Sequence, residues 1–535
     1  MSISPKLTVL LAFAVWGWAL PVRAQVEAPT SATPASSPAP AERAAIAVGP
    51  ASAATATAAA PFAWKLSGHY SIWGLNQRNF FVGRATPLND ADYVVQNFRL
   101  LAAAGTARTG GVLRVDVAQG WWGVDNSPDR SVGVTTDPAT GKVTAQPVYN
   151  ASSLFENKDT MYGAHFDHAY VWAELPWWPL RVQIGRQPVQ LGNMLVLDQD
   201  LDAVRLHGRL GETVQVGALW AKMAEGVGAY RNPSGALMND DGVNADADLV
   251  GLTLDVKLKN HRLEAFALRY LDRSPTETYL PQGLGYLHAR FAPQVSEAHA
   301  LGVRAAGLVA LAQGLHYDIE VDALTGKDGI ANTSHAGNLL DVNDGNLSGW
   351  NAWLALTQKL DVGMPVDVGL SAGAGSGDGD PMGGGGNLNR IQTMGFFALT
   401  NVWEDSIMPD VAGISPQGLG SPVSRGYREL ENTTVAQLRL GVAPFKDLRI
   451  DTSLTWLQAT EPVHGWDAQG PTAVTSRDLG YEIDANLTAK LWDGLTVRSE
   501  LGWFVPGEAA ALLINGTTAA KEVAWESKFI VQYVF

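Results

Sequence analysis

The chain has 535 residues, of which 46% are hydrophobic and only 17% are charged, with 56 Gly and 18 Trp. It contains no Cys, which excludes disulfides, thiolate catalysis, Cys-ligated zinc and a lipid anchor on Cys. Its formal net charge of −15 argues against a nucleic-acid partner.

The N-terminus is typical of an export signal. Lys6 supplies a short positive region, residues 7–20 form an apolar run, and Val22-Arg23-Ala24 resembles a small-residue cleavage site. The run is shorter than the ~20 residues that a helix needs to span a membrane. We therefore predict a signal peptide over residues 1–24. No later stretch is long and apolar enough to predict a membrane helix.

A linker is predicted next. Residues 25–61 are rich in Ala, Pro, Ser and Thr, with almost no charge and no periodicity. This composition is typical of a disordered periplasmic linker, which either acts as a spacer or tethers the protein to the cell wall. The folded part is predicted over residues 62–535.

Segments with a two-residue hydrophobic period follow one another from Trp64 to the end. In residues 112–122, one face carries apolar side chains such as Leu113 and the other carries Arg114 and Asp116. Residues 249–258 and 481–491 repeat the pattern. A period of two predicts strands, and an apolar outer face with a polar inner face is typical of a transmembrane barrel. A soluble β-sandwich has the same period but buries its apolar face between two sheets.

The connections distinguish these two folds because short and long ones alternate. Short connections are predicted near residues 107–110, 176–179, 211–212, 260, 312–314, 361–365, 446–447 and 493–494. Long connections are predicted near residues 79–91, 124–165, 193–200, 226–245, 274–296, 327–346, 379–430, 462–476 and 509–519. A sandwich gives no reason for this alternation. We predict an all-β fold, a transmembrane antiparallel β-barrel of about 18 strands with short periplasmic turns and long extracellular loops.

The last strand supports a barrel in the outer membrane of a Gram-negative cell. One of its faces is apolar and ends on the terminal aromatic residue, as expected of a closing strand and its assembly signal: Phe529, Val531, Tyr533 and Phe535. Further aromatic residues are predicted at the two membrane interfaces: Trp121, Trp122, Trp177, Trp178, Trp350, Trp456, Trp492, Trp503 and Phe504.

Motifs that would indicate an enzyme are weak. Gly369-Leu370-Ser371-Ala372-Gly373 matches the serine-hydrolase elbow, but it lies inside a predicted strand and not at a strand-to-helix turn. Residues 341–346 and 378–380 carry acids that could bind calcium, yet neither completes a calcium loop. We predict no catalysis, no cofactor and no metal.

Charged residues on the predicted inner face indicate how the lumen works. By alternation, the arginines that point inward are Arg99, Arg114, Arg181, Arg205, Arg304, Arg439 and Arg498. Acids interleave with them: Asp116, Glu174, Asp255, Asp451, Glu482, Asp484 and Glu500. Two interpretations stay open. The arginines line a pore that prefers anions, or they pair with the acids and plug or stiffen the lumen.

One stretch carries a resemblance to a known family. Gly185-Arg186-Gln187, then Gly192-Asn193, then Asp202-Ala203-Val204-Arg205-Leu206 resembles the alginate-export family of outer-membrane porins. Residues 169–174 and 375–378 are similar to two of its other strand motifs, although Leu201 and Ala203 replace an expected Phe and Gly. The resemblance implies a barrel of about eighteen strands with a narrow, Arg-lined channel for an anionic polysaccharide. By position, the resemblance implies that Arg186, Asp202 and Arg205 line the solute path.

These observations predict a channel in the cell outer membrane that passes an anionic polysaccharide or a small anionic solute. Outer loops, especially 124–165 and 379–430, are expected to fold inward and constrict it. A general or sugar diffusion porin without anion preference is one alternative, and a plugged, surface-binding barrel is another. The expected partners are outer-membrane lipid, the barrel assembly machinery and an anionic or carbohydrate solute.

Overall fold

The computed structural model describes most of residues 62–535. The described ranges are 62–80, 82–83, 90–119, 132–136, 143–147, 162–224, 246–273, 295–309, 314–328, 345–379, 389–391, 393–395, 397–403, 430–467, 470–519 and 521–535. The predicted signal peptide and linker lie outside them. Among the described residues, no helix is long and apolar enough to cross a membrane.

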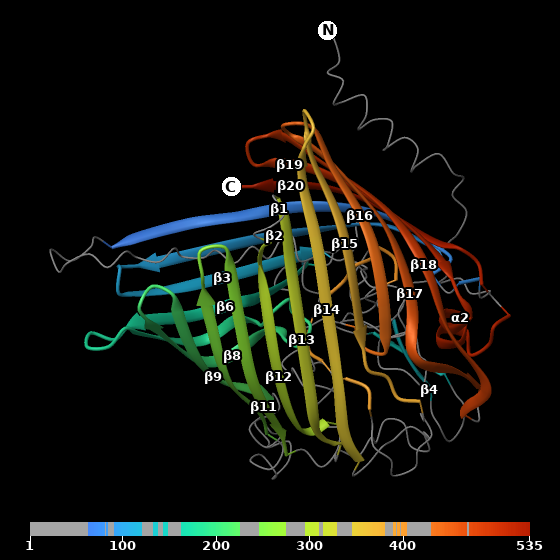
Figure 1. Cartoon of the computed structure of the whole chain (residues 1–535), viewed down its shortest axis with the longest axis horizontal. Coiled ribbons are helices and arrows are strands. Elements are labelled where there is room, and N and C mark those ends of the chain that lie inside the picture. Colours follow the sequence, from blue (N-terminus) through green and yellow to red (C-terminus); the bar gives the residue numbers. More distant parts are fainter. Residues whose placement is uncertain are drawn as a thin grey trace, which may run out of the picture.

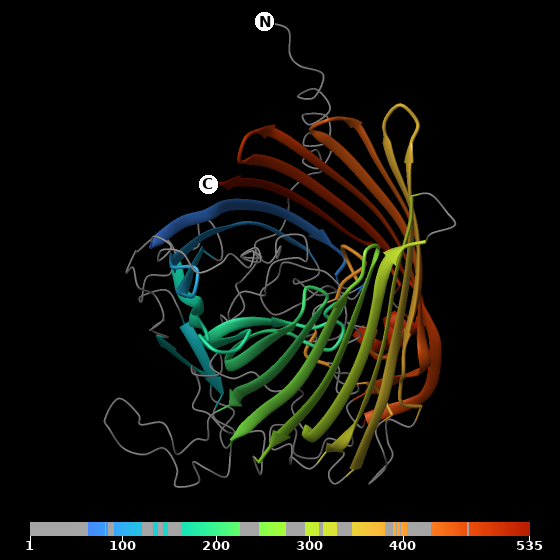
Figure 2. The same cartoon turned by 60° about the vertical axis from the view of Figure 1, so that its left-hand side comes forward.

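An antiparallel sheet of 18 strands closes on itself to form a barrel, as predicted (Figure 1). Neighbouring strands follow the order of the chain, and the wall curves round from blue β1 to dark red β20 (Figure 2). The first half of the wall consists of β1 (Ala63–Arg78), β2 (Ala91–Gly105), β3 (Thr109–Gln119), β6 (Tyr162–Glu174), β7 (Leu180–Gln190), β8 (Asp198–Leu210), β9 (Val214–Ala224), β10 (Ala247–Lys257) and β11 (His261–Asp272).

The second half of the wall consists of β12 (Val295–Leu308), β13 (Leu315–Asp328), β14 (Gly345–Asp361), β15 (Pro365–Gly375), β16 (Thr433–Phe445), β17 (Leu448–Asp467), β18 (Gly470–Trp492), β19 (Leu495–Pro506) and β20 (Ala524–Val534). Helix α2 (Glu508–Asn515) lies between β19 and β20. Two short strands, β4 (Val132–Thr136) and β5 (Val143–Pro147), form a separate hairpin in the loop after β3.

The last strand closes the barrel against the first. Residues 525–534 of β20 pair with residues 69–78 of β1. The backbone N–H and C=O of Phe535 continue this pairing with Gly68, both at 3.0 Å. The Phe535 ring stacks on Phe98 with 6.1 Å between the ring centroids. Closure pairs the backbone groups of both terminal strands, which a wall surrounded by lipid requires.

The predicted alternation of short and long connections holds, with one exception. The short turns fall at one end of the barrel, and the others fall at the opposite end. However, residues 462–476, expected to be a loop, continue β17 and β18 through an irregular pairing. Helix α2 packs against this extension. The extension is therefore supported by packing against a helix that strand periodicity alone does not reveal.

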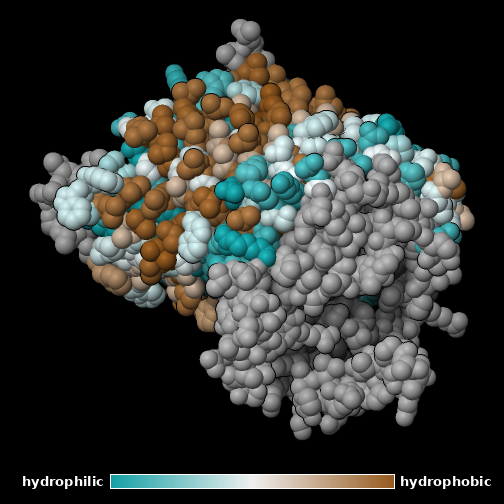
Figure 3. Space-filling model, turned by 90° about the horizontal axis from the view of Figure 1, so that it is seen from below, coloured by the Kyte–Doolittle hydropathy of each residue, from teal (hydrophilic) through white to brown (hydrophobic). Residues whose placement is uncertain are grey.

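The outward face of the wall is apolar along the middle of the strands. Val250 is 50% exposed and Leu252 is 62% exposed, as the period of residues 249–258 predicts. Figure 3 shows apolar side chains gathered over part of the described outer surface. On β18, exposed Tyr481 and Trp492 bracket this band. The eleven steps between them span about 36 Å along the strand, or about 28 Å at a tilt of about 40°, close to the apolar band of such barrels.

Exposed aromatic residues form two groups on this surface. At the short-turn end they are Trp64, Trp177, Trp178 and Trp492, and towards the other end they are Trp220, Trp350, Trp456 and Trp503. Trp121 and Trp122 lie outside the described residues. Phe504 was predicted at an interface, but it is fully buried inside the barrel, where it stacks on Trp403 at 5.0 Å. Phe504 points inward because it is one position from outward Trp503.

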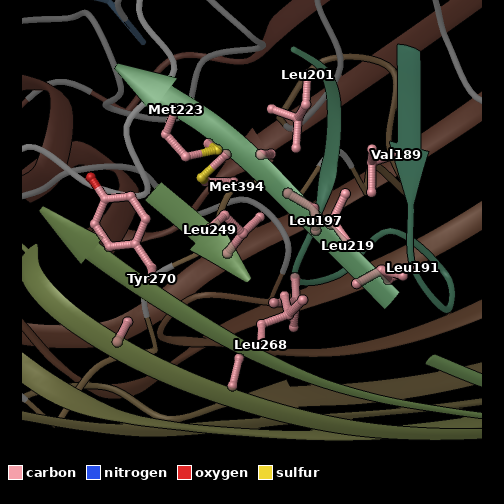
Figure 4. Packing of buried hydrophobic residues seen from close by; sticks show 14 of the residues in the cluster. Val189, Leu191, Leu197, Leu201, Leu219, Met223, Leu249, Leu268, Tyr270 and Met394 are labelled. Carbon is pink, nitrogen blue, oxygen red and sulfur yellow. The ribbon is translucent and has the colours of Figure 1, made fainter. Parts of the chain in front are cut away.

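The β7–β8 hairpin leaves the wall and bends into the lumen. Pairing between β6 and β7 ends at Ala169 and Arg186, and pairing between β8 and β9 ends at Asp202 and Lys222. Beyond these points the two strands pair with each other and no longer with the neighbouring strands of the wall. Apolar side chains of the hairpin then pack on the inner face of β9–β11, and Met394 from the loop after β15 joins them (Figure 4).

Candidate solute path and constriction

The predicted inward arginines lie on the inner face of the wall. Arg114 follows outward Leu113, which is 41% exposed, and Arg304 follows outward Val303, which is 52% exposed. The same alternation places the remaining ones inside: Arg99, Arg181, Arg205, Arg439 and Arg498.

Arg186 and Asp202 lie on the outer face instead. They are cross-strand partners on the same side of the wall as exposed Ile184. Their side chains are 37% and 63% exposed, and Arg186 Nη1 lies 3.5 Å from Asp202 Oδ2. The sequence-based expectation that both line the lumen does not match this geometry. Arg181 and Arg186 are five residues apart on one strand, so they cannot share a face without a bulge.

Several of the inward arginines are neutralised by acids. Arg99 Nε donates to both oxygens of buried Asp116, at 2.7 and 2.9 Å. Arg114 pairs with Asp167 and approaches Asp200 at 3.6 Å. This network lies on β2, β3, β6 and β8, and it matches the interpretation that inward charges stiffen the lumen.

Another group of inward arginines has no acidic partner. Arg205, Arg209 and Arg439 form no ion pair within the described part of the chain. Arg205 Nη1 donates to the carbonyl of Pro188 at 3.0 Å. Arg181 lies near Arg205 on the inner face, pairs with Glu174 at 2.7 Å, and lies 4.3 Å from the centre of the Trp172 ring. The β7–β8 wall below the hairpin is therefore locally basic.

Two inward-folded segments meet in the lumen, and together they form the candidate constriction. One is the hairpin tip, residues 191–197, and the other is the described part of residues 389–403. The two meet in the lumen through backbone hydrogen bonds: Met394 N donates to Val196 O at 2.9 Å, and Asp198 N donates to Met394 O at 3.0 Å. The expectation that the 379–430 loop folds inward is confirmed for its described residues. The side chains of the 124–165 loop lie outside the description.

Buried acids on the wall hold both segments in place. Asn193 N donates to Glu320, and Asn193 Nδ2 donates to Asp318 at 3.0 Å. Arg304 Nη1 donates to the carbonyl of Gly192 at 3.3 Å. Further along the wall, on β18, Val402 N and Trp403 N donate to the two oxygens of Glu482 at 2.6 and 2.9 Å.

Sequence reasoning placed Glu482 and Asp484 inside but did not identify them as acceptors for a loop, and it missed Glu320 and Asp322 altogether. The available signal was the alternation of acids with apolar residues at 318–322, which puts three carboxyls on the inner face of one strand. The loops that bind these carboxyls come from distant parts of the chain, and periodicity does not predict contacts between distant segments.

The motif that carries the family resemblance bends the hairpin. Gly185 has φ of +122°, a conformation that an L side chain rarely adopts. Gln187 is fully buried, and its Nε2 donates to the carbonyls of Gly185 at 3.1 Å and Ala203 at 2.9 Å. Of the residues that the resemblance places in the solute path, only Arg205 faces the lumen.

The closed barrel, its apolar outer band and its polar, charged interior define an outer-membrane β-barrel. The lipid contacts the outer band, and the charged residues face the interior.

No protein-family model and no curated protein matches the sequence. In fold, the chain is similar to the crystal structure of OccAB1 from Acinetobacter baumannii, with a TM-score of 0.47 and 11% identity over 88% of this chain and 96% of that one. It is also similar to OccK9 (OpdG) from Pseudomonas aeruginosa, with a TM-score of 0.47 and 12% identity over 88% and 98%. At these values the likeness concerns overall architecture, and what the lumen carries has to be inferred from its own residues.

Proposed function

We propose that the protein is a channel that passes an anionic polysaccharide or a small anionic solute along the basic wall of β7–β8. The observation that carries this proposal is the asymmetry of pairing. Inward acids such as Glu482 and Asp116 accept hydrogen bonds from a loop or pair with an arginine, whereas Arg205, Arg209 and Arg439 have no acidic partner within the described residues. A guanidinium binds a carboxylate through two parallel hydrogen bonds, which suits the uronate groups of an alginate-like polymer.

The test is the reversal potential of the refolded barrel in a planar bilayer under a salt gradient. We expect anion selectivity, and we expect it to fall in Arg205→Gln. One charge about 6 Å from a permeating ion contributes about 0.7 kcal/mol in a water-like medium, or about three-fold in permeability. Arg186→Gln is the matched control, because Arg186 lies on the outer face and its loss should leave selectivity unchanged.

Two other outcomes would select the alternatives. Cation selectivity of the wild-type channel would indicate a general or sugar diffusion porin. The joined inward segments specifically favour the plugged, surface-binding barrel as the second candidate, and an absence of conductance would support it. If anion selectivity falls equally in Arg205→Gln and in Arg186→Gln, Arg205 does not lie on the solute path.

We also propose that export and assembly follow the pattern of the sequence. Cleavage after Ala24 would leave Gln25 as the first residue of the mature chain, followed by the linker, and the intact mass of the protein from the outer membrane tests this. The apolar face of the closing strand, with exposed Tyr533 and Phe535, would serve as the signal for the barrel assembly machinery.

A further inference from the structure

Two pairs of buried acids lie on the inner face of the wall, on strands that are five positions apart in the barrel. Glu320 and Asp322 lie two residues apart on β13 and are 0% and 1% exposed. Glu482 and Asp484 lie two residues apart on β18 and are 0% and 3% exposed. Both pairs point into the lumen, where each holds an inward-folded segment.

The pair on β18 is fully supplied with hydrogen-bond donors. The backbone N–H groups of Val402 and Trp403 bind the two oxygens of Glu482. Asp484 accepts from Asn401 N at 3.4 Å and from Ser453 Oγ at 2.9 Å.

The pair on β13 lacks such a full set of hydrogen-bond donors. Glu320 accepts from Asn193 N through one oxygen, while its Oε1 and both carboxylate oxygens of Asp322 have no donor from outside this pair. Neither residue forms an ion pair with a basic side chain in the described part of the chain. Arg304, on the neighbouring strand, is engaged by Asp318 at 2.6 Å and by Glu264 at 2.8 Å.

Adjacent carboxylates without counter-charge are costly to bury. A hard divalent cation matches both their charge and their oxygen atoms. We propose that Glu320 and Asp322 bind a calcium ion behind the hairpin tip. No group of three His, Asp or Glu suited to a metal occurs among the described residues, so the remaining ligands would be amide, backbone or water oxygens. Calcium accepts such oxygens in flexible geometry, whereas zinc and copper prefer nitrogen and sulfur.

This site differs from the acidic turns noted in the sequence. Residues 341–344 lie outside the description, and Asp378 accepts a hydrogen bond from Asn389 N at 3.2 Å. Its position also gives the ion a role. The hairpin tip rests on Glu320 through Asn193, and Gly192 lies against the same carboxylate. A calcium ion bound to Glu320 and Asp322 would neutralise both carboxylates. It would thereby fix the hairpin tip against the wall and hold the constriction closed.

The test uses terbium as a calcium substitute on the refolded, full-length barrel. Trp353 is the cross-strand partner of Glu320 and shares the inner face, so it can sensitise terbium emission. We expect sensitised emission in the wild type that calcium displaces and potassium does not. Asp322→Asn should weaken the apparent affinity for terbium about tenfold or more, because a charged ligand is lost. Asp484→Asn, in the satisfied pair, should retain the wild-type affinity.

A second variant tests the proposal even if Asp322→Asn does not fold. Trp353→Phe keeps both carboxylates, so it should lose the sensitised emission while its unfolding temperature still rises with calcium. Emission that persists unchanged in Asp322→Asn would overturn the proposal. So would a wild-type barrel whose stability is indifferent to calcium and chelator, because the two carboxyls would then share a proton or face water.

Discussion

Replacement of Glu482 by Gln should release the inward-folded loop after β15. In the structure, the two carboxylate oxygens of Glu482 accept hydrogen bonds from the backbone of Val402 at 2.6 Å and of Trp403 at 2.9 Å. A hydrogen bond to a charged group contributes about 1.5–3 kcal/mol. Gln retains one neutral acceptor and presents an N–H₂ group to the other donor, so the seated state should lose about 3 kcal/mol, which shifts the seated-to-released ratio about 150-fold.

Two assays follow the loop. Trp403 is fully buried and stacked on Phe504, so its release should raise the quenching of tryptophan fluorescence by acrylamide in Glu482→Gln. Single-channel conductance should rise in the same variant because the constriction widens. Glu500→Gln is the matched control, since Glu500 is an inward acid that contacts Arg498 at 3.6 Å and seats no loop. If both variants match the wild type in quenching and conductance, the reasoning about the carboxylate seat is wrong.

Three further predictions concern the wall. Gly185→Ala should destabilise the bent hairpin by about 1–2 kcal/mol, because φ is +122° there. The control Gly363→Ala lies in an open turn with φ of +86° and should cost less. The temperature at which the folded barrel's band disappears from gels compares the two variants. Asp116→Ala should cost about 3 kcal/mol, because buried Arg99 keeps only the longer contact with Asp167 at 3.5 Å, and a double-mutant cycle in urea should recover most of the loss. Deleting Phe535 should lower the amount of assembled barrel at the cell surface, and normal surface labelling would contradict its role in closure.

The architecture follows from the sequence because a barrel wall repeats one local rule. Each strand separates lipid from the lumen, so apolar and polar residues alternate along it, and the register shows the same alternation at Leu252 and Thr253 or at Ile483 and Asp484. Tight turns and long loops alternate for an equally local reason. The strand count, the closing strand and the inward direction of most arginines were therefore predictable.

The constriction was decided by tertiary structure. The state of Arg99 depends on Asp116, which pairs with it from the neighbouring strand. Glu482 binds a loop instead of lining the lumen because the backbone of residues about 80 positions away donates to it. The β7–β8 hairpin bends inward at Gly185, which turns the expected lining residues Arg186 and Asp202 into an ion pair on the outer face.

The sequence by itself thus determined a closed, lipid-facing barrel with a charged interior. Alternate residues of each strand face lipid and the lumen, so the two-residue period records both environments. Only the tertiary structure decided which charges remain available to a solute and where the lumen narrows. Those properties arise from contacts between segments that are far apart in the chain, and no local pattern encodes them.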